Sequence, residues 1–165
     1  METDLSEIDL LLVEDSPDDT ELTVHALTNE NNSMRLLHLK DGAEALNYLF
    51  KNKSDGNGNS ISNLRLILLD LKLPKVDGLE VLRKIREEDS TRMLPVVILT
   101  SSGQKRDISE AYRLGVNSYV VKPVEFDNFI EKVGAIASYW GQINVKFEQA
   151  FIPYDQLEER NDSRQ

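Results

Sequence analysis

Short apolar runs alternate with longer amphipathic stretches along the chain. The runs are too short for helices and are typical of buried strands, whereas the longer stretches repeat apolar residues at helical spacing. The pattern predicts strands over residues 8–13, 35–39, 64–69, 95–99 and 118–121. It predicts helices over residues 18–29, 41–51, 78–87, 104–114 and 126–140, with Asp41 as an N-terminal cap and Gly115 as a left-handed C-terminal cap.

These elements form five consecutive strand–helix units. Continuous apolar strands that alternate with helices predict a parallel sheet covered on both faces, with right-handed crossovers. We therefore expect one doubly wound α/β domain. The polar, glycine-rich stretch SDGNGNSISN at residues 54–63 predicts a surface loop before the third strand.

Polar side chains follow four of the five predicted strands. Glu14 and Asp15 follow the first strand, Asp70 the third, Thr100 the fourth and Lys122 the fifth. Because the carboxyl ends of parallel strands lie at one edge of the sheet, we expect these side chains to meet. A cluster of carboxylate oxygens suits a hard divalent ion such as Mg²⁺. With the metal and an ammonium present, Asp70 could accept a phosphoryl group as an acyl phosphate.

Each of these residues also has an ordinary interpretation. A single acid after a strand is usually a turn or cap residue, and Asp15 can cap the helix that follows it. Thr100 could be an ordinary strand residue, and Lys122 a solvated cation. The combination at four strand ends is what favours a shared site. His25 lies in a predicted helix and His38 in a predicted strand, and we assign neither a role.

Four segments of the chain resemble the hallmark segments of receiver domains of two-component response regulators, in the same order: LLVEDS, LILLDLKLPKVDG, PVVILTSS and NSYVVKPV. The resemblance covers roughly residues 8–140. It implies the flavodoxin-like (βα)5 fold, with the five strands in the order 2-1-3-4-5. It also implies a phosphoacceptor, Asp70, and a Mg²⁺ site made by Glu14, Asp15, Asp70 and the backbone carbonyl of Lys72.

The same resemblance implies how the site would switch. Thr100 would be the hydroxyl and Lys122 the ammonium that contact the phosphoryl group, and Tyr119 the aromatic residue that changes rotamer. The Lys122–Pro123 peptide bond is typically cis in the family. A sensor histidine kinase or a histidine phosphotransfer protein would supply the phosphoryl group. Phosphorylation would then change the surface made by the fourth helix, the fifth strand and the fifth helix.

Composition and charge narrow the class of protein further. The 165 residues include no cysteine, which excludes disulfides and thiolate metal sites. The net charge of −10 argues against a nucleic-acid surface, because phosphate backbones are bound by clustered basic residues. No apolar stretch approaches the roughly 20 residues of a membrane span, so we expect a cytoplasmic protein. We expect residues 1–140 to be the receiver domain and residues 141–165 an extension and polar tail, without an output domain.

The start of the extension is apolar. Ile143, Val145 and Phe147 alternate in strand fashion after the pair Tyr139 and Trp140. Together with the loop at residues 54–63, this segment resembles the single-domain response regulators of bacterial and cyanobacterial phytochromes, which tend to form dimers. By that resemblance, exposed Trp140, Ile143 and Phe147 would supply dimer contacts. The alternative is that these residues fold back onto their own domain.

Two other classes of protein are alternatives to the receiver. A phosphatase of the haloacid dehalogenase type also uses an aspartate nucleophile with Mg²⁺ and a lysine. Such an enzyme normally carries a second acid two residues after the nucleophile, and Lys72 occupies that position here. A pseudo-receiver that only binds partners would be expected to have lost an acid or the lysine, and all of them are present in the sequence.

Overall fold

The computed structural model describes residues 7–29, 34–50 and 61–147. Strands and helices alternate in five units, as the sequence pattern predicts. The strands are β1 (Leu10–Val13), β2 (Leu36–Leu39), β3 (Leu66–Leu69), β4 (Val96–Thr100) and β5 (Ser118–Val121). The helices are α1 (Pro17–Asn29), α2 (Gly42–Phe50), α3 (Gly78–Glu87), α4 (Lys105–Arg113) and α5 (Phe126–Ser138), followed by the π-helical turn η3 (Tyr139–Ile143).

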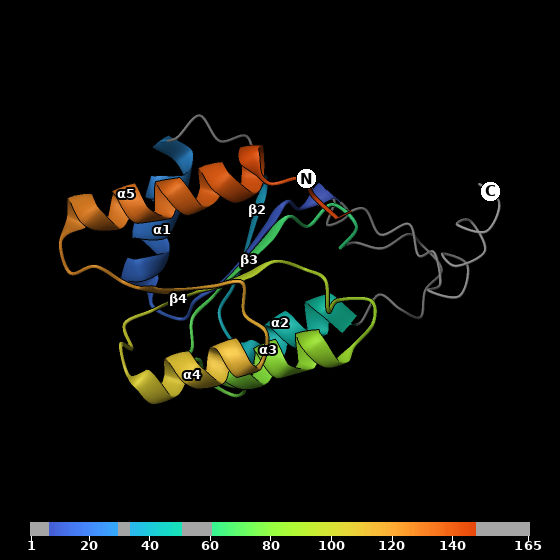
Figure 1. The fold of residues 1–165 in the computed structure, drawn as a ribbon. Helices are drawn as coiled ribbons and strands as arrows, with labels where there is room; N and C mark the ends of the chain where they lie inside the picture. The colour runs from blue at the N-terminus through green and yellow to red at the C-terminus, as the bar shows by residue number, and fades with distance from the viewer. Residues whose placement is uncertain (1–6, 30–33, 51–60, 148–165) are drawn as a thin grey trace, which may run out of the picture.

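The five strands form one parallel sheet in the order β2-β1-β3-β4-β5, which confirms the predicted flavodoxin-like fold. Helices α1 and α5 cover one face of the sheet, and α2, α3 and α4 cover the other (Figure 1). No helix within the described ranges is long and apolar enough to cross a membrane. Residues 51–60, which include most of the predicted loop, and the tail from residue 148 lie outside the described residues.

Alternate residues of each central strand enter two separate hydrophobic cores. In β1, Leu11 and Val13 pack in the core beneath α2, α3 and α4, whereas Leu10 and Leu12 pack in the core beneath α1 and α5. Side chains of a strand point alternately to the two faces of the sheet, so a sheet that is covered on both faces needs apolar residues at every position. This is why the central strands have continuous apolar sequences.

The loop after β3 is fixed by the Asp-Gly pair at residues 77 and 78. Asp77 caps α3 by accepting a hydrogen bond from the backbone N–H of Glu80 at 3.1 Å. Gly78 packs so closely on the end of β3 that a Cβ atom there would lie 2.1 Å from the carbonyl oxygen of Asp70. Only glycine allows this approach, and the start of α3 therefore fixes the backbone at Asp70.

The chain after α5 does not form a strand. Residues Tyr139–Ile143 continue α5 as a π-helical turn, closed by a 2.7 Å hydrogen bond from the N–H of Asn144 to the carbonyl of Tyr139. The prediction of a strand-like segment at Ile143 is therefore wrong, because the backbone groups there are hydrogen-bonded within the helical turn. The predicted left-handed cap at Gly115 is confirmed, with φ at 92°.

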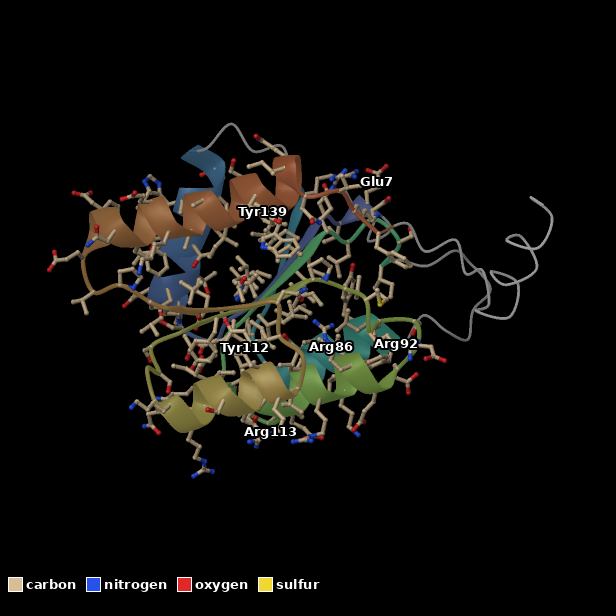
Figure 2. The ribbon with its side chains drawn as sticks, viewed as in Figure 1. Glu7, Arg86, Arg92, Tyr112, Arg113 and Tyr139 are labelled. Carbon is tan, nitrogen blue, oxygen red and sulfur yellow. The ribbon has the colours of Figure 1, made fainter. Side chains whose placement is uncertain are left out.

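The described part of the extension packs on its own domain. Trp140 is half-buried against the core beneath α1 and α5, so the expectation that it is exposed is wrong. Arg65 donates to the carbonyl of Gly141 at 3.5 Å, and Phe147 lines a small pocket with Ile61. The adjacent Tyr139 ring meets the Trp140 ring edge-on, and Tyr139 itself is exposed at the end of α5 (Figure 2). The extension thus folds back at least through residue 147, although Ile143 and Phe147 keep exposed apolar surface.

Candidate functional site

Three carboxylates meet at the carboxyl ends of β1 and β3. Glu14 and Asp15 directly follow β1, and Asp70 directly follows its neighbour β3, with Val13 and Leu69 in register. Each of the three acids offers an oxygen, and these oxygens lie within 4.8 Å of one another. Glu14 and Asp70 are buried, whereas Asp15 is exposed. The expected cluster of acids is present, and its all-oxygen donor set could hold a divalent metal ion.

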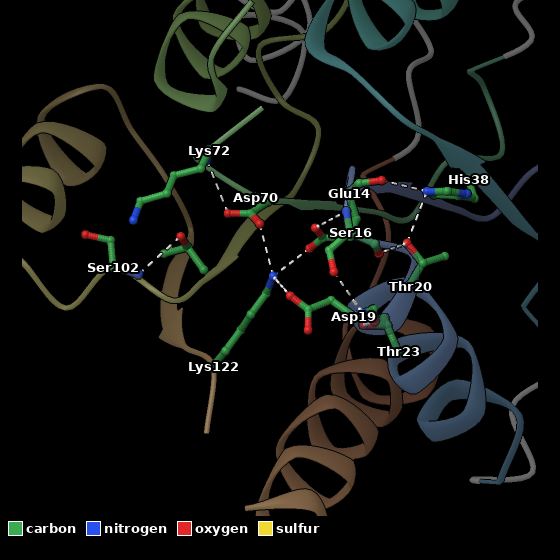
Figure 3. Close-up of polar contacts among 11 residues, drawn as sticks. Glu14, Ser16, Asp19, Thr20, Thr23, His38, Asp70, Lys72, Ser102 and Lys122 are labelled. Carbon is green, nitrogen blue, oxygen red and sulfur yellow. Dashed lines mark hydrogen bonds and ion pairs between the residues drawn. The ribbon is translucent and has the colours of Figure 1, made fainter. Parts of the chain in front are cut away.

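The ammonium of Lys122 enters this cluster from the end of β5. Its Nζ donates to Glu14 Oε2 at 2.6 Å, to Asp19 Oδ2 at 2.7 Å and to Asp70 Oδ2 at 3.0 Å (Figure 3). The Lys122 side chain is only 8% exposed, so the interactions are screened little by water. The structure therefore joins the ends of β1, β3 and β5 through one cation.

Burial and charge shift the pKa values of this pocket. Burial raises the pKa of Glu14 to about 7, although hydrogen bonds from Lys122 and from the Ser16 N–H act in the opposite direction. Burial alone would lower the pKa of Lys122, but the hydrogen bonds to Asp19 and Glu14 outweigh it, so this pKa is raised and the ammonium stays charged. One ammonium faces several carboxylates, and the pocket therefore favours a further cation.

The loop after β3 is bonded to Asp70, whereas the side-chain contact at the end of β4 is local. The backbone N–H of Lys72 donates to Asp70 Oδ1 at 3.3 Å. Thr100, the last residue of β4, is fully buried, and its hydroxyl oxygen accepts from the N–H of Ser102 at 3.4 Å. The Lys72 backbone is thus tied to Asp70, and the role of the Thr100 hydroxyl toward a phosphoryl group stays a prediction. The role of the Lys72 carbonyl as a metal ligand stays a prediction.

Tyr119 connects β5 to the loop between β4 and α4. Its side chain is half-buried, and its hydroxyl donates to the carbonyl of Ser102 at 2.8 Å. Burial raises the pKa of Tyr119, so its phenol remains protonated and able to donate. Ser102 is thus held from two sides, by Thr100 and by Tyr119. The rotamer change of Tyr119 stays a prediction.

Sequence reasoning missed two residues of this pocket, Asp19 and His38. Asp19 looks like one of the acids that are common in the first turn of a helix, and nothing in its spacing indicates a contact with Lys122. His38 Nε2 lies 2.7 Å from the backbone oxygen of Glu14 and 3.3 Å from Thr20 Oγ1. Because β2 and β1 are paired, His38 reaches across to the backbone of an acidic residue in the site.

One expectation about the backbone is wrong. The described residues contain no cis peptide bond, so the bond between Lys122 and Pro123 is trans. The trans form is the lower in energy for an X–Pro bond, by about 0.5–1 kcal/mol. From this backbone the Lys122 ammonium reaches the carboxylates of Glu14, Asp19 and Asp70.

Comparison with known sequences identifies the family. Residues 10–134 match the sequence profile of the response regulator receiver domain. The chain belongs to the receiver domain family. The matched range contains every residue of the pocket, from Glu14 to Lys122. Because the match ends at residue 134, the domain boundary at residue 140 stays a prediction.

Two relatives of this receiver are similar over most of their length. The probable methanogenesis regulatory protein FilR2 of Methanothrix harundinacea is 41% identical over 131 residues, which are 79% of this chain and 82% of the relative. The response regulator Rcp1 of Synechocystis sp. is 37% identical over 131 residues, 79% of this chain and 87% of the relative.

Solved structures of the same group match the fold. The phosphorylated cyanobacterial phytochrome response regulator RcpA aligns with a TM-score of 0.75 at 34% identity, covering 84% of this chain and 97% of that one. The Mn²⁺-bound form of Rcp1 aligns with a TM-score of 0.75 at 35% identity, with the same coverage. This receiver is therefore related to the response regulators of cyanobacterial phytochromes, as the sequence segments indicate.

Proposed function

We propose that this receiver accepts a phosphoryl group on Asp70 from a sensor histidine kinase or a histidine phosphotransfer protein, with Mg²⁺ bound. The observation that carries the proposal is that the Glu14 and Asp70 carboxylates both lie within hydrogen-bonding distance of the Lys122 ammonium. Asp70 directly follows the central strand β3, and the start of α3 fixes its backbone.

The donor set of the pocket fits a divalent ion. Glu14, Asp15 and Asp70 would hold the ion, together with the backbone carbonyl of Lys72. When bound, the ion supplies positive charge that offsets the charge of the phosphoryl oxygens. The Mn²⁺-bound form of Rcp1 supports such a site in this group of proteins.

The transfer step uses Asp70 as the nucleophile. An Asp70 carboxylate oxygen attacks the phosphorus of a phosphohistidine, and a bond between oxygen and phosphorus forms as the phosphorus–nitrogen bond breaks. The electron pair of the broken bond stays on the imidazole nitrogen of the donor, which can then take up a proton. Lys122, already 3.0 Å from Asp70 Oδ2, would stabilise the negative charge on the transferred group.

The signal would leave the site through the loop after β4. The phosphoryl group would draw in the Thr100 hydroxyl and the Lys122 ammonium, and Tyr119 would then change its rotamer. Because Tyr119 bonds to the carbonyl of Ser102 in this loop, a movement of the loop and of the ring would be coupled. The output would be a changed surface of α4, β5 and α5.

The relation to phytochrome response regulators makes a phytochrome the candidate kinase. We further propose that the receiver forms a homodimer, with contacts from Ile143 and Phe147, whereas Trp140 packs on its own domain. The exposed fractions of Ile143 (66%) and Phe147 (55%) support an apolar contact at this place.

Acetyl phosphate with Mg²⁺ tests the proposed chemistry without the kinase. We expect one acid-stable, base-labile phosphate per chain, and none in Asp70→Asn. Asp89→Asn makes the same substitution at an exposed acid after α3 and should be labelled like the wild type. Many turnovers of acetyl phosphate would instead support the phosphatase, and an unlabelled wild type would support the pseudo-receiver.

A further inference from the structure

The side chain of Asp19 does not make the local hydrogen bond that is usual for its position in the first turn of α1. It is the third residue of the helix, and Ser16, the residue before the helix, accepts a hydrogen bond from the Asp19 N–H at 3.3 Å. In a capping box the side chain at this third position returns a hydrogen bond to the N–H of the cap residue. Here the Ser16 N–H donates to Glu14 Oε1 at 3.0 Å instead. Glu14 thus accepts the hydrogen bond from the Ser16 N–H that the Asp19 carboxylate would otherwise accept.

The Asp19 carboxylate turns into the pocket and meets Lys122. The distance of 2.7 Å between Asp19 Oδ2 and Lys122 Nζ is close to the 2.6 Å between Lys122 and Glu14 and shorter than the 3.0 Å between Lys122 and Asp70 (Figure 3). The Asp19 side chain is 35% exposed, whereas those of Glu14, Asp70 and Lys122 are at most 10% exposed. Asp19 is therefore the outermost acid on the ammonium, on the solvent side of the pocket.

This arrangement makes two groups of acids compete for one cation. Glu14 and Asp70 hold the ammonium of Lys122 from the inner side, where a divalent ion would need the same two carboxylates. Asp19 holds it from the outer side. A phosphoryl group on Asp70 would also need this ammonium, so Asp19 would have to give up part of its interaction with Lys122 when the receiver is phosphorylated.

We propose that Asp19 is a positioning residue that holds Lys122 outward in the unphosphorylated receiver, and thereby favours the divalent ion while opposing the phosphoryl group. The proposal rests on the proposed function of the site. Outward attraction of the ammonium lowers its competition with the metal for Glu14 and Asp70, and the charge of Asp19 adds attraction for the cation. The same charge repels the anionic phosphoryl group and retains the ammonium that this group needs.

Asp19→Asn tests the proposal because it removes the charge and keeps the size of the side chain. Mg²⁺ binding is measured by calorimetry, and binding of beryllofluoride, a phosphoryl analogue, is then measured with Mg²⁺ saturating. We expect Mg²⁺ affinity to fall and beryllofluoride affinity to rise, each about fivefold, which is the scale of one partly exposed ion pair. Loss of folding would weaken both ligands and so cannot produce these opposite shifts.

Two further variants complete the test. Asp18→Asn removes the same charge from the preceding, exposed residue of the same helical turn and should leave both affinities close to those of the wild type. Asp19→Glu keeps the charge and should keep Mg²⁺ and beryllofluoride affinities close to wild type. Shifts of both ligands in one direction, or an Asp19→Asn result equal to that of Asp18→Asn, would overturn the role of Asp19 alone. A wild-type protein that binds neither ligand would overturn the proposed function as well.

Discussion

Two cations, the buried Lys122 side chain and the half-buried Arg86, lie at opposite ends of the sheet and are held in opposite ways. Lys122 follows β5 at the carboxyl end, and all three of its partners are carboxylates. Arg86 lies near the end of α3, where the chain enters β4 and β5 (Figure 2). Its guanidinium donates at 2.8–3.1 Å to neutral acceptors only: the carbonyls of Gly115, Arg92 and Leu94 and the amide oxygen of Asn117.

The two sets of partners indicate different roles. The acidic pocket around Lys122 needs further positive charge, whereas Arg86 holds the loops at the other end of the sheet together. Burial lowers the pKa of Arg86, and no acid is among its partners in these contacts to oppose that effect. Around Lys122 the acids raise the pKa against burial, and they outnumber the ammonium. The planar guanidinium of Arg86 donates to several neutral acceptors at once, and these acceptors need no further ion. The acids around Lys122 still carry excess negative charge, and a cation should stabilise them.

Lys122→Met is expected to have the largest effect on stability. Without a divalent ion, the variant should lose about 3 kcal/mol of unfolding free energy, because two buried carboxylates lose their cation. Burial already raises the pKa of Glu14, and loss of the Lys122 hydrogen bond raises it further, so protonation of Glu14 keeps the loss at the lower end of the range for a broken buried pair. Added Mg²⁺ should recover much of the loss, since it replaces the missing charge.

Urea unfolding with EDTA and then with Mg²⁺ measures both parts of this expectation. Lys84→Met serves as the control, because Lys84 is exposed on α3 and forms only surface ion pairs. A deficit in Lys122→Met that stays the same with and without Mg²⁺ would contradict the view that the pocket mainly needs positive charge.

The cluster of side chains at the carboxyl end of the sheet was predictable from the sequence, because it follows from the order and direction of the strands. Once five strand–helix units are recognised, parallel strands bring Glu14, Asp70 and Lys122 to one edge whatever the details of the loops. Asp19 was not predictable in the same way. Its contact depends on which of two acids takes the Ser16 N–H, a choice between local hydrogen bonds that spacing does not encode.

The amino end of the sheet was harder to predict. Arg86 is one of several basic residues in α3, and only the folded loops show that it meets four acceptors there. The alternation of Ile143, Val145 and Phe147 has the period of a strand, but the chain leaves α5 through a π-helical turn. An apolar alternation of three positions is too short to decide between these backbones.

Arg86→Ala should have the next largest effect, a loss of about 2 kcal/mol in the free energy of unfolding, because several acceptors lose their donor. Arg86→Lys should lose a large part of this as well, since an ammonium cannot span the separate acceptors. The loss should be independent of Mg²⁺, unlike that of Lys122→Met, and urea unfolding measures it. Arg113→Ala, at an exposed side chain with a surface ion pair, is the matched control. If Mg²⁺ rescued Arg86→Ala, the two ends of the sheet would not differ as we describe.

The smallest effect concerns the apolar surface that remains at the amino end after the extension has folded back. Ile143→Ser removes exposed apolar area from the proposed dimer contact, and we expect the dimer dissociation constant to rise about tenfold. Sedimentation of the wild type and the variant over a range of concentrations measures this change. Ile143→Leu keeps the apolar area and should dimerise like the wild type. Because Ile143 is 66% exposed, neither change should affect unfolding by more than about 0.5 kcal/mol. Equal sedimentation of Ile143→Ser and the wild type would mean that Ile143 makes no dimer contact. The extension would then only pack on its own domain, through contacts such as those of Gly141 with Arg65 and of Phe147 with Ile61.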